Sequence, residues 1–150
     1  MARRPAPPAA LLGSPDDVEA QLYQALQRGD IDKLMALWAD DDEIVCVHPG
    51  GGRVIGPAAI RASFEAIFGG GGIPVRPEQV HRQGHISCAV HHLVERIEVR
   101  GEQGPQVAWV LATNVYVKTP QGWRLSAHHA SPGSPHEPAP SANDAPATIH

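Results

Sequence analysis

A histidine at the end of a β-rich run is the first residue of this sequence that could do chemistry. His48 closes the run 44–48, which stops at Pro49 and three glycines. An imidazole, with an unperturbed pKa near ~6.5, can take or give a proton near neutral pH. His48 is therefore a candidate general base. The alternative is a histidine that is hydrogen-bonded within a hairpin.

An amide lies in the middle of a predicted strand. Asn114 shares a strand face with Val110, Ala112 and Tyr116, and an amide there is costly unless it is hydrogen-bonded. It could orient a substrate carbonyl or hold His48. Alternatively, it bonds to a neighbouring strand or helix end.

A carboxylate also falls among apolar residues. Glu95 shares a strand face with Leu93 and Ile97, so burial should raise its pKa unless it is paired. It is a candidate general base, or the partner of a pocket histidine. The alternative is an ion pair with an arginine such as Arg53 or Arg124.

The sequence holds nine histidines and two cysteines, which raises the question of a metal. Two imidazoles and a carboxylate, for instance His48, His129 and Glu95, could hold zinc or iron. No tight ligand motif supports this, and the spacing of Cys46 and Cys88 matches no zinc or redox motif. We therefore predict neither metal nor cofactor, and two reduced, buried thiols. The alternative for Cys46 is a nucleophile.

Size and composition bound the class of protein. The 150 residues fit one domain, and 42% of them are hydrophobic. A net charge of −4 without a clustered basic face argues against nucleic-acid binding. No apolar run could span a membrane, and we expect a cytoplasmic protein. Residues 1–13 and 132–150 are rich in Pro and Ala, so we expect disordered tails around a domain at 14–131.

The elements that must position these residues follow from periodicity and turn signals. Helices are predicted from Ser14 to Gly29, from Asp30 to about residue 40 and from Gly56 to about residue 68. A hairpin at 44–55 precedes the third helix. Strands at 75–83, 86–99, 106–119 and 123–131 follow it. Helices and strands that are segregated in this way indicate an α+β fold with an antiparallel or mixed sheet.

The long strands are apolar on both faces. In the strand at 86–99, Leu93 and Ile97 alternate with Val90 and Val94, so neither face is plainly a solvent face. A sheet that is apolar on both faces must be covered on both. Three helices cover one face, and we predict that a second copy of the chain covers the other in a homodimer.

Three segments in this order resemble the nuclear transport factor 2-like superfamily, in its SnoaL-like and ketosteroid isomerase-like branch. They are LYQALQRGDIDKLMALWADDDEIVCVHPGG (22–51), GPAAIRASFEAIF (56–68) and ATNVYVKTPQGWRLSAHHAS (112–131). The resemblance implies a cone-shaped fold, with three helices packed on a curved sheet around an internal pocket. It implies that Trp38 and Tyr116 line the pocket wall. The alternative for both is ordinary core packing.

The resemblance to ketosteroid isomerases can be followed residue by residue. Their base aspartate, before the proline of the first hairpin, is similar in position to His48. Their oxyanion tyrosine on the first helix resembles Leu22 in position, and their protonated aspartic acid resembles Asn114. The base is thus a different group and one donor is missing, which argues against steroid isomerisation. The resemblance also implies that His129 faces inward, as a second acid or base, and that His128 faces outward.

Three functions remain open at this point. The first is an isomerase, cyclase or hydratase that acts on a small hydrophobic carbonyl compound. The second is a module that binds a small hydrophobic ligand without chemistry. The third is a dimerisation module with a vestigial pocket. The missing donor at Leu22 favours the last two, whereas a buried cluster of His, Asn and Glu side chains favours the first.

Overall fold

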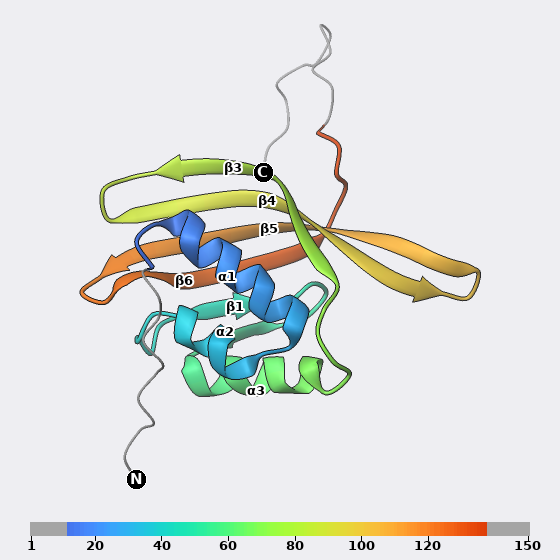
Figure 1. Cartoon of the computed structure of the whole chain (residues 1–150), viewed down its shortest axis with the longest axis horizontal. Coiled ribbons are helices and arrows are strands. Elements are labelled where there is room, and N and C mark those ends of the chain that lie inside the picture. The colour runs from blue at the N-terminus through green and yellow to red at the C-terminus, as the bar shows by residue number, and fades with distance from the viewer. Residues whose placement is uncertain (1–11, 138–150) are drawn as a thin grey trace, which may run out of the picture.

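The computed structural model describes residues 12–137. The predictions for the tails at 1–11 and 138–150 lie outside this range. Within it, no helix is both long and apolar enough to cross a membrane. The described chain folds into three helices and one six-stranded sheet (Figure 1). This confirms the predicted α+β fold.

Each of the first two helices begins at a predicted cap. In α1 (Pro15–Arg28), the Ser14 hydroxyl accepts a hydrogen bond from the Asp17 amide, and Pro15 stands at the first helical position. In α2 (Ile31–Leu37), Asp30 accepts from the Lys33 amide. Gly29, with φ of 64°, ends α1 in the left-handed conformation that glycine adopts without strain. The third helix, α3 (Pro57–Phe68), follows Gly56.

The sheet is mixed and has the order β2-β1-β6-β5-β4-β3. Its strands are β1 (Val45–Val47), β2 (Arg53–Ile55), β3 (Val75–Gly84), β4 (Cys88–Gly101), β5 (Gly104–Thr119) and β6 (Gly122–Pro132). All neighbours are antiparallel except β1 and β6, which run parallel. The far end of the β4–β5 hairpin extends beyond the body of the molecule (Figure 1).

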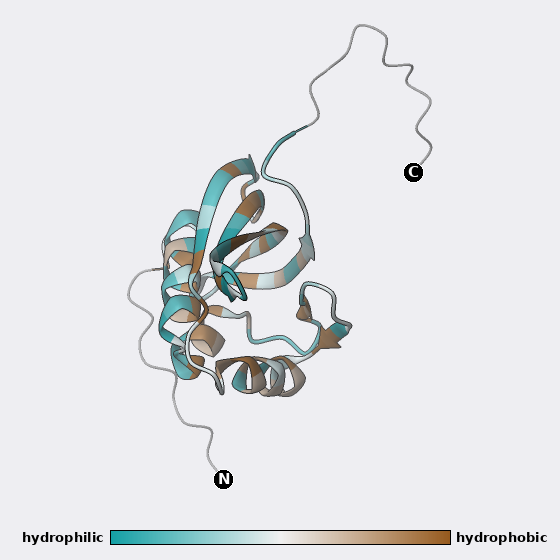
Figure 2. Cartoon of the chain, turned by 90° about the vertical axis from the view of Figure 1, so that its right-hand side faces the viewer, coloured by the Kyte–Doolittle hydropathy of each residue, from teal (hydrophilic) through white to brown (hydrophobic). Residues whose placement is uncertain are grey.

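The helices lie on one face of this sheet, which we call the inner face (Figures 1 and 2). No helix of the described chain lies against the opposite, outer face. The core between helices and inner face includes Leu34 and Leu37 from α2, Ile60 from α3, and Leu125 from β6.

The folded region is slightly longer than predicted. Leu12, in the segment assigned to the N-terminal tail, is buried, and its carbonyl accepts a hydrogen bond of 2.8 Å from the Trp123 amide. At the other end, β6 runs one residue past the predicted boundary, to Pro132. Leu12 gains apolar burial beside the start of β6, and this residue therefore belongs to the folded region although the segment before it is rich in Pro and Ala.

Candidate functional site

A row of buried, chemically active side chains crosses the inner face of four neighbouring strands. Cys46 on β1 pairs with His128 on β6. His128 pairs on its other side with Asn114 on β5, and Asn114 pairs with His91 on β4. All four side chains are buried. Because one face of a sheet collects alternate residues of each strand, this register alone brings the four groups into one line.

Helix α1 adds two more polar groups above this row. Glu19 and Tyr23 lie one turn apart on the same side of α1, and both are buried. Oε2 of Glu19 accepts hydrogen bonds of 2.7 Å from Nδ1 of His91 and from the hydroxyl of Tyr116. The first turn and a half of α1 is thereby fixed to β4 and β5 through a single carboxylate oxygen.

Tyr23 lies at the centre of the network. Its hydroxyl donates to Oε2 of Glu95 at 2.7 Å and accepts from Nδ2 of Asn114 at 3.2 Å. Burial, followed by the charge of Glu95, raises the pKa of Tyr23 well above its ordinary value. Burial raises the pKa of Glu95 to about 6, although the Tyr23 bond works in the opposite direction. Glu95 is thus hydrogen-bonded to a phenol, where the sequence offered an arginine as the alternative partner.

His128, and not His129, faces inward. His128 is buried, and its Nδ1 lies 2.5 Å from Oδ1 of Asn114, an oxygen that only accepts, so the imidazole donates. Burial, followed by the positive charges of His48 and His129, lowers the pKa of His128 to about 4. At neutral pH the ring is therefore neutral, with a lone pair on Nε2.

The prediction that His129 lines the inside is wrong. His129 is exposed on the outer face. The cause is a β-bulge: Val115 pairs with Ala127, but Tyr116 pairs with Leu125, so Ser126 is an extra residue in β6. One extra residue reverses the faces of every side chain beyond it. The suggested metal ligands His48, His129 and Glu95 consequently do not share a face.

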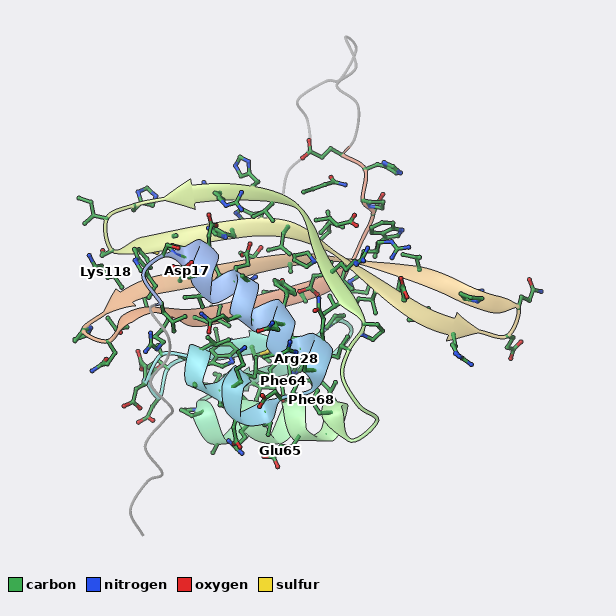
Figure 3. All side chains as sticks on the ribbon, viewed as in Figure 1. Asp17, Arg28, Phe64, Glu65, Phe68 and Lys118 are labelled. Atoms are coloured by element: carbon green, nitrogen blue, oxygen red, sulfur yellow. The ribbon has the colours of Figure 1, made fainter. Side chains whose placement is uncertain are left out.

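His48 lies at the end of β1, against α3. Its Nε2 is 3.0 Å from Oγ of Ser63 and 3.8 Å from Sγ of Cys46, and its ring meets the Phe64 ring edge-on, with centroids 4.8 Å apart. Phe64 and Phe68 lie along the side of α3 that faces the body, whereas Glu65 points away (Figure 3). Burial lowers the pKa of His48, which favours the neutral base. Burial raises the pKa of the Cys46 thiol to about 12, which argues against a nucleophile.

Trp38 and Tyr116, which were predicted to line a pocket, are buried, and so is Leu22, which the resemblance places in the position of the oxyanion tyrosine. Leu22 and Tyr116 belong to the core, and Tyr116 also holds Glu19. Trp38 is 4% exposed, and its Nε1 is the one buried side-chain N or O atom of the described residues without a hydrogen-bond partner. A buried N–H without an acceptor is costly, so this atom is an exception among the buried polar groups of the described residues.

Sequence reasoning missed several members of this network. Tyr23 supplies the first-helix phenol that the resemblance placed at Leu22, one residue earlier. Glu19, His91 and Ser63 were also not singled out. A signal was present in α1, because Glu19 and Tyr23 recur with the apolar residues Val18 and Leu22 at helical spacing.

One group of side chains has the composition of a metal site. Ligand atoms of Asp16, Glu19 and His91 all lie within 4.8 Å of one another. Each already has a protein partner, since Asp16 forms an ion pair of 2.8 Å with Arg82 and Glu19 bonds to His91. A cation would have to displace Arg82 and the shared proton of the buried pair. The arrangement is complete as a hydrogen-bonded cluster.

Comparison with known proteins agrees with this architecture. Residues 16–135 match the family model of the SnoaL-like domain. A candidate calcium/calmodulin-dependent protein kinase type II association domain from Thiobacillus denitrificans is 32% identical, with a TM-score of 0.74. That match covers 81% of this chain and 97% of the other.

Two other solved structures are informative. A candidate dehydratase of the nuclear transport factor 2-like family from Streptomyces avermitilis is 30% identical over 77% of this chain and 91% of its own, with a TM-score of 0.69. The calcium/calmodulin-dependent protein kinase II hub from S. rosetta shares the fold at 21% identity and a TM-score of 0.63, over 89% of this chain and 100% of its own. No curated protein sequence matches the chain. The family model and the two relatives at 30% identity or more show that the chain belongs to the SnoaL-like domain family of the nuclear transport factor 2-like superfamily.

Proposed function

We propose that this chain binds a small hydrophobic carbonyl compound between the helices and the inner face of the sheet, and transfers a proton on it. The SnoaL-like fold is that of a pocket-type protein, which supports a ligand in this position. The candidate groups are His48, His128, Asn114, Tyr23 and Glu95.

One observation carries the proposal: a continuous line of buried hydrogen bonds from Glu95 through Tyr23 and Asn114 to His128. Apolar side chains of similar volume would hold the core together at a lower desolvation cost. A network of this kind clusters groups whose pKa values burial has shifted, which is the usual signature of an acid–base site.

The protonation states in the network suit proton transfer at neutral pH. His48 and His128 both have lowered pKa values, so each is a neutral imidazole with one lone pair. The amide of Asn114 is bonded to His128 and has a second N–H besides the one that it donates to Tyr23. Such a donor stabilises the negative charge that develops on a carbonyl oxygen. The unpartnered N–H of Trp38 supports an oxygen-bearing ligand.

The similarity to the candidate dehydratase supports the same class of chemistry. Dehydration of a hydroxy-carbonyl compound removes a proton next to the carbonyl and protonates the departing hydroxyl group. Both steps need a positioned base and a positioned acid, which neighbouring imidazole and carboxyl groups provide.

The test is a binding titration with 2-naphthol, an apolar compound whose oxygen mimics that of an enolate. Binding is measured through the fluorescence of 2-naphthol. We expect saturable binding to the wild-type chain. Loss of one hydrogen bond in a buried site should weaken this binding about tenfold in His128→Gln. His129→Gln is the matched control, because it removes the adjacent imidazole from the outer face, and it should bind within about twofold of wild type. Absence of saturable binding, or equal losses in both variants, would contradict the proposal.

A second function, self-association, is favoured by the outer face of the sheet. Val90, Val94 and Val115 lie on this face with Trp109 and Leu111, and Leu111 is 44% exposed. No helix of the described chain covers it (Figure 2). The 32% identical relative, described as an association domain, supports a role in assembly. We propose that a second copy covers this face.

Sedimentation velocity tests this second function. We expect a dimer for the wild type, because a stable interface needs about 800 Å² from each partner and the four long strands offer a broad surface. Leu111→Glu should give a monomer with unchanged circular dichroism. Ile86→Glu, at a 93% exposed turn position, should remain a dimer. A monomeric wild type, or a dimeric Leu111→Glu variant, would refute the outer face as the interface.

A further inference from the structure

A serine on α3 lies within hydrogen-bonding distance of the imidazole of His48. Oγ of Ser63 lies 3.0 Å from Nε2 of His48, and it also lies 2.7 Å from the carbonyl oxygen of Ile60, one turn back in the same helix. The serine therefore has two neighbours but a single hydrogen. Which neighbour receives that hydrogen decides the role of Ser63.

The direction of both hydrogen bonds follows from the donor inventory. A carbonyl oxygen only accepts, so the bond of 2.7 Å requires the hydroxyl hydrogen of Ser63 to point at Ile60. The hydroxyl oxygen then offers only lone pairs to His48. Nε2 of His48 must carry a hydrogen and donate it. A neutral imidazole has one N–H, so the lone pair lies on Nδ1.

The surroundings of His48 agree with this direction. No described residue forms a hydrogen bond to Nδ1, whereas Nε2 has both Ser63 and the more distant Cys46 beside it. The edge-on contact with Phe64 restricts rotation of the ring, which keeps Nε2 toward α3. Nδ1 is therefore the atom of the ring that is left for a ligand.

We infer that Ser63 is a positioning residue that holds His48 in the Nε2–H form and leaves Nδ1 as the proton acceptor. The role of Nδ1 in catalysis rests on the proposed function, but the protonation pattern of the ring does not. The same geometry excludes Ser63 as a nucleophile activated by His48. Such a pair needs the serine hydrogen to point at the imidazole, and here it points at the Ile60 carbonyl.

The experiment is long-range ¹H–¹⁵N NMR of histidine-labelled, full-length protein at pH 8, where His48 is neutral. The His48 signals are assigned by their loss in His48→Gln. We expect the Nε2–H form to dominate in the wild type. Because one neutral hydrogen bond is worth about 1 kcal/mol, Ser63→Ala should lower the ratio of Nε2–H to Nδ1–H about fivefold. Ser63→Thr, which keeps the hydroxyl, should preserve the ratio.

Ala62→Ser, at the exposed neighbouring position of α3, is the control for a change in the helix itself and should leave the ratio unchanged. A wild type in the Nδ1–H form would overturn the inference, because Ser63 would then donate to Nε2. An unchanged ratio in Ser63→Ala would overturn it as well. Neither measurement needs a ligand, so this inference can fail or hold separately from the 2-naphthol result.

Discussion

The hydroxyl of Tyr23, on the first helix, donates a hydrogen bond of 2.7 Å to Glu95, 72 residues further along the chain. Both groups are buried, and this bond fastens α1 to the centre of the sheet. A phenol stabilises the ionised carboxylate, yet burial outweighs it and leaves the pKa of Glu95 at about 6. The ionised form of Glu95 is thus tolerated at neutral pH at a cost in stability.

Glu95→Gln should reveal this cost as a pH dependence. The pKa of Glu95 rises from 4.5 to about 6 on folding, so the folded chain binds this proton more tightly than the unfolded chain. Stability from this group is present at low pH and is lost as pH rises through this interval. Between pH 4.5 and 6.5, the free energy of unfolding measured in urea should fall by about 2 kcal/mol more for the wild type than for Glu95→Gln. Glu102→Gln, at an exposed position, is the control. If the difference in unfolding free energy between wild type and Glu95→Gln did not change with pH, the raised pKa of Glu95 would be contradicted.

His128→Gln should show the opposite sign. The pKa of His128 falls from 6.5 to about 4 on folding, chiefly because of burial. Its contribution is fully present above pH 6.5 and is lost as pH falls toward 4. Over this interval, the free energy of unfolding measured in urea should fall by about 3 kcal/mol more for the wild type than for His128→Gln. His129→Gln, on the outer face, should track the wild type. If both histidine variants behaved alike, the bulge at Ser126 would be misplaced.

Trp38→Phe should separate stability from binding. The substitution removes a buried N–H that has no acceptor among the described residues, which relieves about 1–3 kcal/mol and offsets the loss of ring volume. We expect an unfolding free energy within about 1 kcal/mol of wild type, together with weaker 2-naphthol binding. Trp123→Phe, at another buried position, also loses ring volume but removes no unpartnered N–H, so it should be destabilising. A strongly destabilised Trp38→Phe chain would show that its N–H has an acceptor after all.

Gly72→Ala should destabilise the connection between α3 and β3. A Cβ atom at Gly72 would run into the backbone carbonyl of Gln27, a group that cannot move without disturbing the end of α1. We expect a loss of about 1–3 kcal/mol in thermal or urea unfolding. Gly70→Ala is the matched control, since nothing lies within 4 Å of its added Cβ. Equal stability of the two variants would argue against the close approach of this loop to α1.

The part of the fold that depends on local pattern could be predicted from the sequence. Ser14 and Asp30 cap α1 and α2 as expected, and Gly29 separates them. The alternation around Glu95 and Asn114 placed both side chains on a buried face, where the structure has them. These features depend on neighbours within a few residues, so the sequence contains the information directly.

The partners of those residues could not be predicted in the same way. Neighbouring positions on a helix differ by about 100° in direction, so the choice between Leu22 and Tyr23 as the residue above Asn114 depends on how α1 docks on the sheet. The choice between His128 and His129 depends on a single extra residue in β6. A bulge is set by the pairing of two strands and not by either strand alone.

The sequence by itself therefore determined the family of the chain, the order of its elements and the presence of buried polar groups, because capping and alternation act over short distances. Only the tertiary structure decided that Glu95 bonds to Tyr23, that His128 faces inward and that Ser63 holds His48. Those contacts join residues between 14 and 72 positions apart. Their geometry comes from strand register and helix docking, which arise only when the whole core packs.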